Sequence, residues 1–390
     1  MKTLKPFAAS VLAFSSVALL AACGGKNYTA NNKAIVIGNS GPLTGTYAIY
    51  GIGVENAINM AVEEINAAQA KKDGENFTFS YKAKDDQADA EMAAQNFNTL
   101  YESGMQVSLG CVTSGACVGF AGADEENNVF KLTPSATADA VCKAGVYQMC
   151  FSDSGQGKAA AKYIQEKYAG KKVGVLYNSS QDYSKGIYQN FVSVFGEENL
   201  TAKATFTDDN AASFDGQVSA LKNCDLVFLP IYYTPATTFI RAAYGQLPND
   251  AIYFGADGLD GIDGVSGFDV NSFPQKISML SHFNSASEEE ATKKFVAAYT
   301  AKYDASSLNQ FAASAYDCVY AIYGMMEQYE AKGNKIPTTI SAKDLNTILT
   351  GEIANYTFNG VTGSNVKWNT DHTVDKTPVE YEINKNRVSA

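Results

Sequence analysis

The feature that most constrains the fold of this chain is a repeated alternation of short apolar runs with segments of helical periodicity. Residues 34–38 and 173–177 are apolar runs of strand length. The segment that follows the first run, residues 54–68, places Val54, Ile58 and Ile65 on one helical face. Strands that alternate with helices in this way predict an α/β fold, in which mostly parallel sheets are flanked by helices.

The alternation occurs in two series, and the second begins after residue 151. No Pro-rich or Ser-rich linker separates the two series. A chain of 390 residues is too long for a single hydrophobic core. We therefore expect two α/β units that are joined by ordered segments.

The first 22 residues have the pattern of an export signal. Lys2 and Lys5 precede an uncharged segment of apolar and small residues, 6–22. The run Leu20-Ala-Ala-Cys23 resembles the bacterial lipobox, in which the cysteine is acylated and becomes the first residue of the mature protein. We expect a lipoprotein signal peptide at 1–22, a tether at 23–33, and a protein anchored to the cell membrane through Cys23, on the extracytoplasmic face. The alternative is an ordinary cleaved signal that leaves Cys23 unmodified.

Charge and motifs restrict the possible functions. Removal of residues 1–22, which contain two lysines and no acid, shifts the net charge from −11 to −13, and such an acidic protein is a poor partner for nucleic acid. The chain has two histidines and lacks the Gly-x-Ser-x-Gly, phosphate-loop and His-Glu-x-x-His motifs. We expect a binding protein rather than an enzyme, with no catalytic residue, cofactor or metal site.

Six cysteines follow Cys23 in a chain that we expect in a disulfide-permissive compartment. Cys142 and Cys150 form the best candidate pair, because residues 143–146 offer a turn that brings two short extended arms together. Cys224 and Cys318 are expected to be buried free thiols. Six cysteines allow 15 connectivities, so the pairing of the others stays open.

In parallel sheets, ligands bind beyond the carboxyl ends of the strands. The loops expected there contain motifs that together resemble the substrate-binding proteins of bacterial branched-chain amino acid ABC transporters, the Leu/Ile/Val-binding type. The resemblance spans residues 35–383. Its motifs are Gly41-Pro-Leu-Thr-Gly45 with Tyr50-Gly51, Asp85-Asp86, Thr113-Ser-Gly115, Thr133-Pro-Ser-Ala-Thr137, Asp182-Tyr-Ser-Lys-Gly186, Phe254-Gly-Ala-Asp-Gly258, Ala315-Tyr-Asp-Cys-Val-Tyr320 and Phe358-Asn-Gly-Val-Thr-Gly363.

The resemblance implies a periplasmic-binding-protein type I fold, in which two lobes joined by three hinge crossings close around an amino acid. It places the crossings near Phe151, Leu280 and Gly360. The first lobe would then contain residues 34–150 and 281–360, and the second lobe residues 151–280 and 361–390. We expect a monomer that delivers its ligand to the permease subunits of the transporter.

The resemblance also assigns the parts of the ligand site. Ser114 and Thr137 would bind the ligand's α-carboxylate, since both lie at loops that lead into helices. The backbone carbonyl of Ser135 and the side chain of Asp257 would bind the α-ammonium. Three tyrosines complete the site: Tyr183 and Tyr232 from the second lobe, and Tyr50 at the side-chain end of the pocket.

The side-chain pocket does not match a leucine-type site closely enough to name the amino acid. An alternative with the same fold binds an amide, urea or an aromatic compound, which would not use Asp257 in the same way. A sensory ligand-binding protein is a second alternative.

Overall fold

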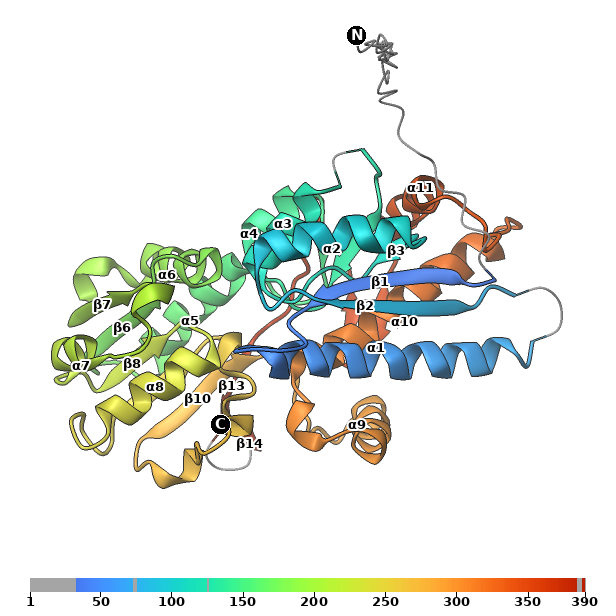
Figure 1. The fold of residues 1–390 in the computed structure, drawn as a ribbon. Coiled ribbons are helices and arrows are strands. Elements are labelled where there is room, and N and C mark those ends of the chain that lie inside the picture. Colours follow the sequence, from blue (N-terminus) through green and yellow to red (C-terminus); the bar gives the residue numbers. More distant parts are fainter. Residues whose placement is uncertain (1–32, 73–75, 125, 384–387, 390) are drawn as a thin grey trace, which may run out of the picture.

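The computed structural model describes residues 33–72, 76–124, 126–383 and 388–389. It contains two α/β lobes that lie side by side (Figure 1), which confirms the expected fold class. The predicted signal peptide, Cys23 and most of the tether lie outside the described residues.

The first lobe is built on a parallel sheet with strand order β2-β1-β3-β4-β5. The strands are β1 (Ile35–Gly41), β2 (Phe79–Asp85), β3 (Val107–Ser108), β4 (Phe130–Thr133) and β5 (Tyr147–Gln148). The helices of this lobe are α1 (Ala48–Gln69), α2 (Ala90–Glu102), α3 (Ser114–Gly122), α4 (Asp139–Lys143), α9 (Glu290–Lys302), α10 (Gln310–Ala331) and α11 (Ala342–Ile353). The long helices α1 and α10 pack against each other, and α11 packs on β4.

The second lobe has the sheet order β14-β13-β10-β9-β8-β6-β7, in which β6 to β10 are parallel and β13 and β14 are antiparallel. Its strands are β6 (Val173–Asn178), β7 (Ala202–Phe206), β8 (Leu226–Leu229), β9 (Ile252–Gly255), β10 (Lys276–Ser281), β13 (Val379–Glu382) and β14 (Val388–Ser389). Its α-helices are α5 (Asp153–Lys167), α6 (Asp182–Phe195), α7 (Asp215–Leu221) and α8 (Tyr233–Ala243). The short 3-10 turns are η1 (Glu197–Asn199), η2 (Asp208–Asn210), η3 (Asp257–Leu259), η4 (Ile262–Gly264), η5 (Val270–Ser272) and, in the first lobe, η6 (Ala305–Ser307).

Local sequence explains where several helices begin. The side chains of Asp89, Ser152, Asn309 and Ser341 accept hydrogen bonds from backbone amides in the first turns of α2, α5, α10 and α11. Such N-caps satisfy amide groups that have no partner within the helix. Apolar runs form the central strands, and all residues of β1 and β8 are buried.

The chain passes between the lobes three times, and the third passage differs from the prediction. The first passage lies between β5 and α5, and the second directly follows β10. After α11 the chain forms the hairpin of β11 (Phe358–Gly360) and β12 (Gly363–Val366). The chain then stays with the first lobe. The Trp368 indole donates to the backbone carbonyl of Gln148 (2.8 Å), and the backbone N–H of Gln148 donates to the backbone carbonyl of His372 (3.0 Å). The chain joins the second sheet only at β13, so the crossing expected near Gly360 was placed too early.

The expected disulfide between Cys142 and Cys150 is not present in the structure, where both residues are buried free cysteines. The prediction assumed two extended arms, but Cys142 lies in the helix α4. The Cys150 thiol instead donates to the carbonyl of Ala136 (3.6 Å). Cys224 and Cys318 are buried free thiols, as expected.

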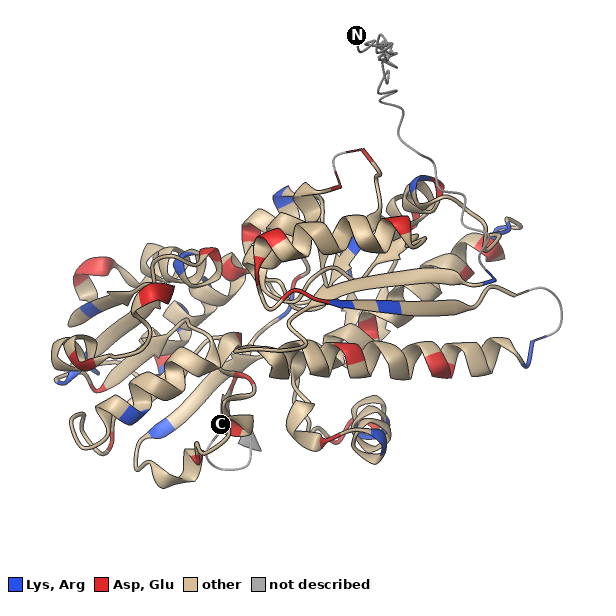
Figure 2. Ribbon diagram, viewed as in Figure 1, with Lys and Arg blue, Asp and Glu red and all other residues tan. Residues whose placement is uncertain are grey.

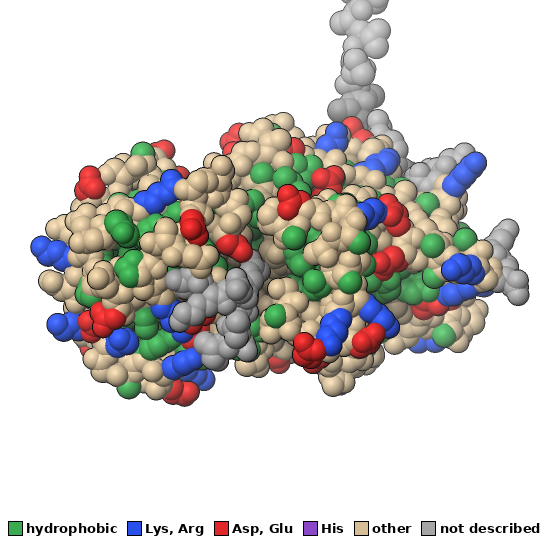
Figure 3. Space-filling view, turned by 90° about the horizontal axis from the view of Figure 1, so that it is seen from below, with side chains coloured by type: hydrophobic (Ala, Val, Ile, Leu, Met, Phe, Trp, Pro, Cys, Tyr) green, Lys and Arg blue, Asp and Glu red, His purple; other side chains and the backbone are tan. Residues whose placement is uncertain are grey.

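The surface of the described part carries dispersed charges. Figure 2 shows Lys and Arg spread over both lobes among acidic residues, and Figure 3 shows small groups of hydrophobic side chains separated by polar and charged ones. None of the helices that the structure describes has the length and apolar character needed to cross a membrane. Within the same residues, no group of three or more His, Cys, Asp or Glu side chains is placed to hold a metal ion.

Candidate ligand site

The residues predicted to bind ligand lie where parallel strands end. Ser114 begins α3 after β3, and Ser135 and Thr137 lie between β4 and α4. In the second lobe, Tyr183 is in the first turn of α6 after β6, Tyr232 is the N-cap of α8 after β8, and Asp257 begins η3 after β9. Because the carboxyl ends of neighbouring parallel strands meet at one edge of each sheet, these loops face each other between the lobes.

All seven predicted residues line one small, nearly filled cavity of about 10 Å³. This is smaller than the roughly 300–1,000 Å³ of pockets for drug-sized ligands. The remaining lining residues are Val112, Thr113, Gly258 and Phe311, and none of the residues that line the cavity is Lys, Arg or His. The only ionisable side chains that line it are those of Asp257 and three tyrosines.

At one end of the cavity, Ser114 joins two loops of the first lobe. Its hydroxyl oxygen accepts hydrogen bonds from the backbone amides of Thr137 and Ala138, both at 3.2 Å. The hydroxyl proton of Ser114 remains available to donate. The hydroxyl oxygen of Thr113 is buried without a hydrogen-bond partner in the described residues. These hydroxyls, beside the start of α3, can donate to an anionic group of a ligand.

Asp257 provides the opposite chemistry in the second lobe. Its side chain is buried, with 1% of the residue exposed, and its Oδ1 accepts a hydrogen bond from the Tyr183 hydroxyl (2.7 Å). The same hydroxyl accepts the backbone amide of Gly258 (2.8 Å). The Oδ2 atom has no hydrogen-bond partner within the described part of the chain. Burial raises the pKa of Asp257 to about 7, although the Tyr183 hydrogen bond favours the ionised form.

Aromatic rings form the rest of the wall. The rings of Tyr183 and Tyr232 stack with centroids 4.6 Å apart. Tyr50 packs edge-on against Phe311 (5.0 Å), and its hydroxyl donates to the Gly258 carbonyl in the other lobe. The Tyr50 hydroxyl is thus used in a contact between the lobes, and the ring is the part of this side chain that a ligand would meet.

Sequence reasoning did not single out four of the lining residues, nor a second acid near the site. Thr113 stands within the Thr-Ser-Gly motif and could have been found there, whereas Phe311 lies in α10 with no local signal. The second acid, Asp153, is buried in the first turn of α5. Its backbone amide donates to the Thr137 carbonyl (2.8 Å). Burial is the main reason that the pKa of the Asp153 carboxyl is raised, and the nearby charge of Asp257 raises it further.

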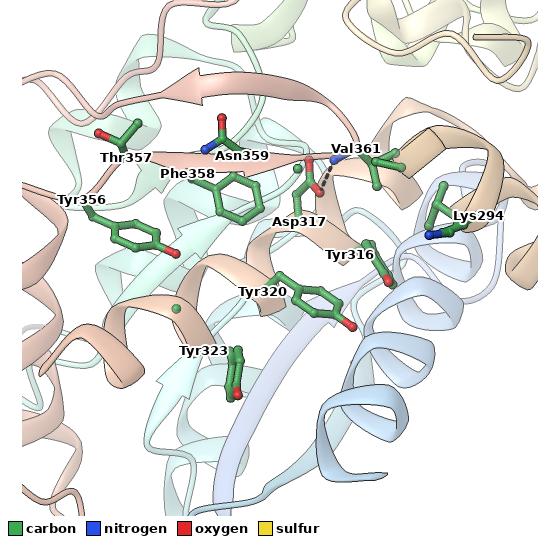
Figure 4. A pocket seen from close by; sticks show the side chains of 14 residues that line it. Lys294, Tyr316, Asp317, Tyr320, Tyr323, Tyr356, Thr357, Phe358, Asn359 and Val361 are labelled. Atoms are coloured by element: carbon green, nitrogen blue, oxygen red, sulfur yellow. Dashed lines mark hydrogen bonds between the residues drawn. The ribbon is translucent and has the colours of Figure 1, made fainter. Parts of the chain in front are cut away.

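A larger and more open cavity of about 540 Å³ lies on the outside of the first lobe (Figure 4). Tyr316, Tyr320 and Tyr323 of α10 face a segment that contains Tyr356 and Phe358. None of the predicted ligand residues lines this cavity. Because all its walls come from one lobe, a ligand there would not bring the two lobes together.

Comparison with known proteins decides the family. A family model described as periplasmic binding protein matches residues 34–386. The chain belongs to this family. It is accordingly a binding protein and not an enzyme.

Three individual proteins show what this chain is similar to. The Leu/Ile/Val-binding protein BraC3 of Rhizobium johnstonii is 29% identical over 269 residues, which are 66% of this chain and 68% of that protein. The branched-chain amino acid transporter substrate-binding protein LivJ of Streptococcus pneumoniae, solved in complex with isoleucine, has a TM-score of 0.76 at 29% identity and covers 92% of this chain and 98% of its own. A solute-binding protein from R. palustris in complex with benzoate has a TM-score of 0.74 at 18% identity, with 92% and 95% covered, and shares the fold.

Proposed function

We propose that this protein is the extracytoplasmic substrate-binding subunit of an ABC importer. It binds an amino acid with a branched-chain or related apolar side chain between its lobes and delivers it to the permease. The observation that carries the proposal is the Asp257 carboxylate, which is buried with one unpaired oxygen in a cavity that has no basic side chain.

A buried carboxylate is costly unless a charged partner accompanies it. The α-ammonium of an amino acid supplies that partner, while the hydroxyls of Thr113 and Ser114 and the start of α3 suit its α-carboxylate. The rings of Tyr50, Tyr232 and Phe311 supply an apolar wall for the side chain to pack against. Similarity to LivJ, which was solved with isoleucine, supports the same assignment.

An aromatic acid fits this cavity less well, since it has no cation for Asp257 and would place a second negative charge near it. A thermal-shift screen of the soluble body against the twenty amino acids, amides and aromatic acids tests the proposal. We expect isoleucine, leucine or valine to raise the unfolding temperature most. Stabilisation by an aromatic acid or an amide, and by no amino acid, would reject it.

Asp257→Ala should weaken amino-acid binding more than Ser114→Ala. Removal of one partner of a buried charge pair costs about 2–5 kcal/mol. Loss of the Ser114 hydroxyl costs about 1.5–3 kcal/mol, and it frees the amides of Thr137 and Ala138 for the ligand carboxylate. Asp257→Asn keeps the shape without the charge and should resemble Asp257→Ala. Calorimetric titration with the best ligand measures the order; wild-type affinity in Asp257→Asn would show that no ammonium lies there.

Amino-acid affinity should also depend on pH through Asp257. The carboxylate form pairs with the ammonium, and in the closed lobes without ligand the pKa of Asp257 is about 7. Below pH 7 the group must lose a proton to bind, so affinity should fall by up to about tenfold per pH unit. Above pH 7 the affinity should be nearly constant. Titrations between pH 5 and 8 test this, with Asp257→Asn as the control, which should bind weakly with a much flatter profile.

The lipid anchor is part of the proposal, and it is supported by the lipobox-like run that ends at Cys23. Cys23→Ser should abolish incorporation of a fatty-acid analogue in exporting cells. Equal labelling of the variant and the wild type would reject lipidation at this cysteine and leave the rest of the proposed function untouched.

A further inference from the structure

Tyr47, which does not line the cavity, forms a bridge between the lobes beside it. The residue is the N-cap of α1 in the first lobe. Its ring packs edge-on against Tyr232 (4.8 Å between centroids) and Tyr233 (6.1 Å) of the second lobe. On its own lobe it stacks on Tyr50 at 6.3 Å. Tyr47 therefore covers two of the rings that form the cavity wall.

The hydroxyl of Tyr47 reaches a second element of the other lobe. It lies close enough to the side chain of Gln181, the N-cap of α6, for the two polar groups to interact. The Gln181 amide also donates to Oδ1 of Asp208 (2.8 Å), and Asn178 donates to the same oxygen (2.7 Å). Asp208 thus holds Gln181 in place. Burial raises the pKa of Tyr47 to about 12, so the phenol is neutral under ordinary conditions.

The preceding residue makes a parallel contact. The hydroxyl of Thr234 in α8 donates to the backbone carbonyl of Thr46 (3.1 Å). Two adjacent residues that precede α1 therefore contact the second lobe, at the beginnings of α6 and α8. Contacts of this kind exist only while the lobes are closed, because their partners belong to different lobes.

We infer that Tyr47 is a positioning residue that latches the closed lobes and thereby sets how long a ligand is retained. The inference rests on the proposed function, in which an amino acid binds between the lobes. Neither Tyr47 nor Gln181 lines the cavity, and Tyr47 meets it only through its contacts with two lining rings, Tyr50 and Tyr232. Their contribution therefore acts on the closed state as a whole. In the open state, where a ligand enters, the two side chains are apart.

The test is stopped-flow measurement of association and dissociation rates for the amino acid found in the screen. Tyr47→Phe removes only the hydroxyl and should raise the dissociation rate about 3- to 10-fold. The association rate should change less than about twofold, since most such effects appear in dissociation. Tyr47→Ala also removes the ring and should raise the dissociation rate further. Tyr244→Phe, which removes a hydroxyl from an exposed tyrosine, is the matched control and should match the wild type.

A double-mutant cycle separates the latch from a general loss of structure. Tyr47→Phe with Gln181→Ala should dissociate no faster than Gln181→Ala alone, because both changes break the same contact. With saturating ligand, these variants should unfold at a lower temperature than the wild type. Without ligand, they should unfold at the same temperature as the wild type. Binding with wild-type dissociation in Tyr47→Phe, or effects that simply multiply in the double variant, would overturn the latch. If wild type binds no amino acid, the proposed function fails first.

Discussion

The buried carboxylate of Asp257 is the constraint around which the rest of the candidate site is arranged. Burial of an ionised carboxylate away from water is unfavourable, and this raises the pKa of Asp257 to about 7. Tyr183 satisfies one oxygen, and the other is left without a partner among the described residues. If the lobes close on an empty cavity, the Asp257 carboxylate is buried without a cationic partner. If they close on a ligand with a cationic group, that group supplies the partner. A ligand with an ammonium group thus favours the closed form by a direct electrostatic interaction.

Sheet topology brings the groups for both ends of such a ligand together. Ser114 and Thr137 follow strands of the first sheet, and Asp257 and Tyr232 follow strands of the second. Each set lies at the carboxyl edge of its own sheet, and the two edges face each other. Because the hydroxyls come from one lobe and the carboxylate from the other, neither lobe alone offers both kinds of partner. The two-lobe architecture is in this sense required by the chemistry that we propose for the ligand.

Much of this arrangement could be predicted from the sequence, because it depends on local patterns. Periodicity identified the helix α1, and the family resemblance assigned seven residues that the structure brings to one cavity. The errors have a common physical origin. Cys142 lies in a five-residue helix, too short for periodicity to reveal, and the third passage between the lobes depends on Trp368 packing on β5. Phe311 and Tyr47 act through contacts with residues far away in the chain, which no local pattern encodes.

Closure of the lobes around the ligand is the central element of this account, and small-angle X-ray scattering measures it most directly. The radius of gyration of the soluble body should decrease when a saturating concentration of the bound amino acid is added, because the ligand favours contacts between the lobes. An unchanged scattering profile, at a ligand concentration where calorimetry shows full binding, would contradict the account.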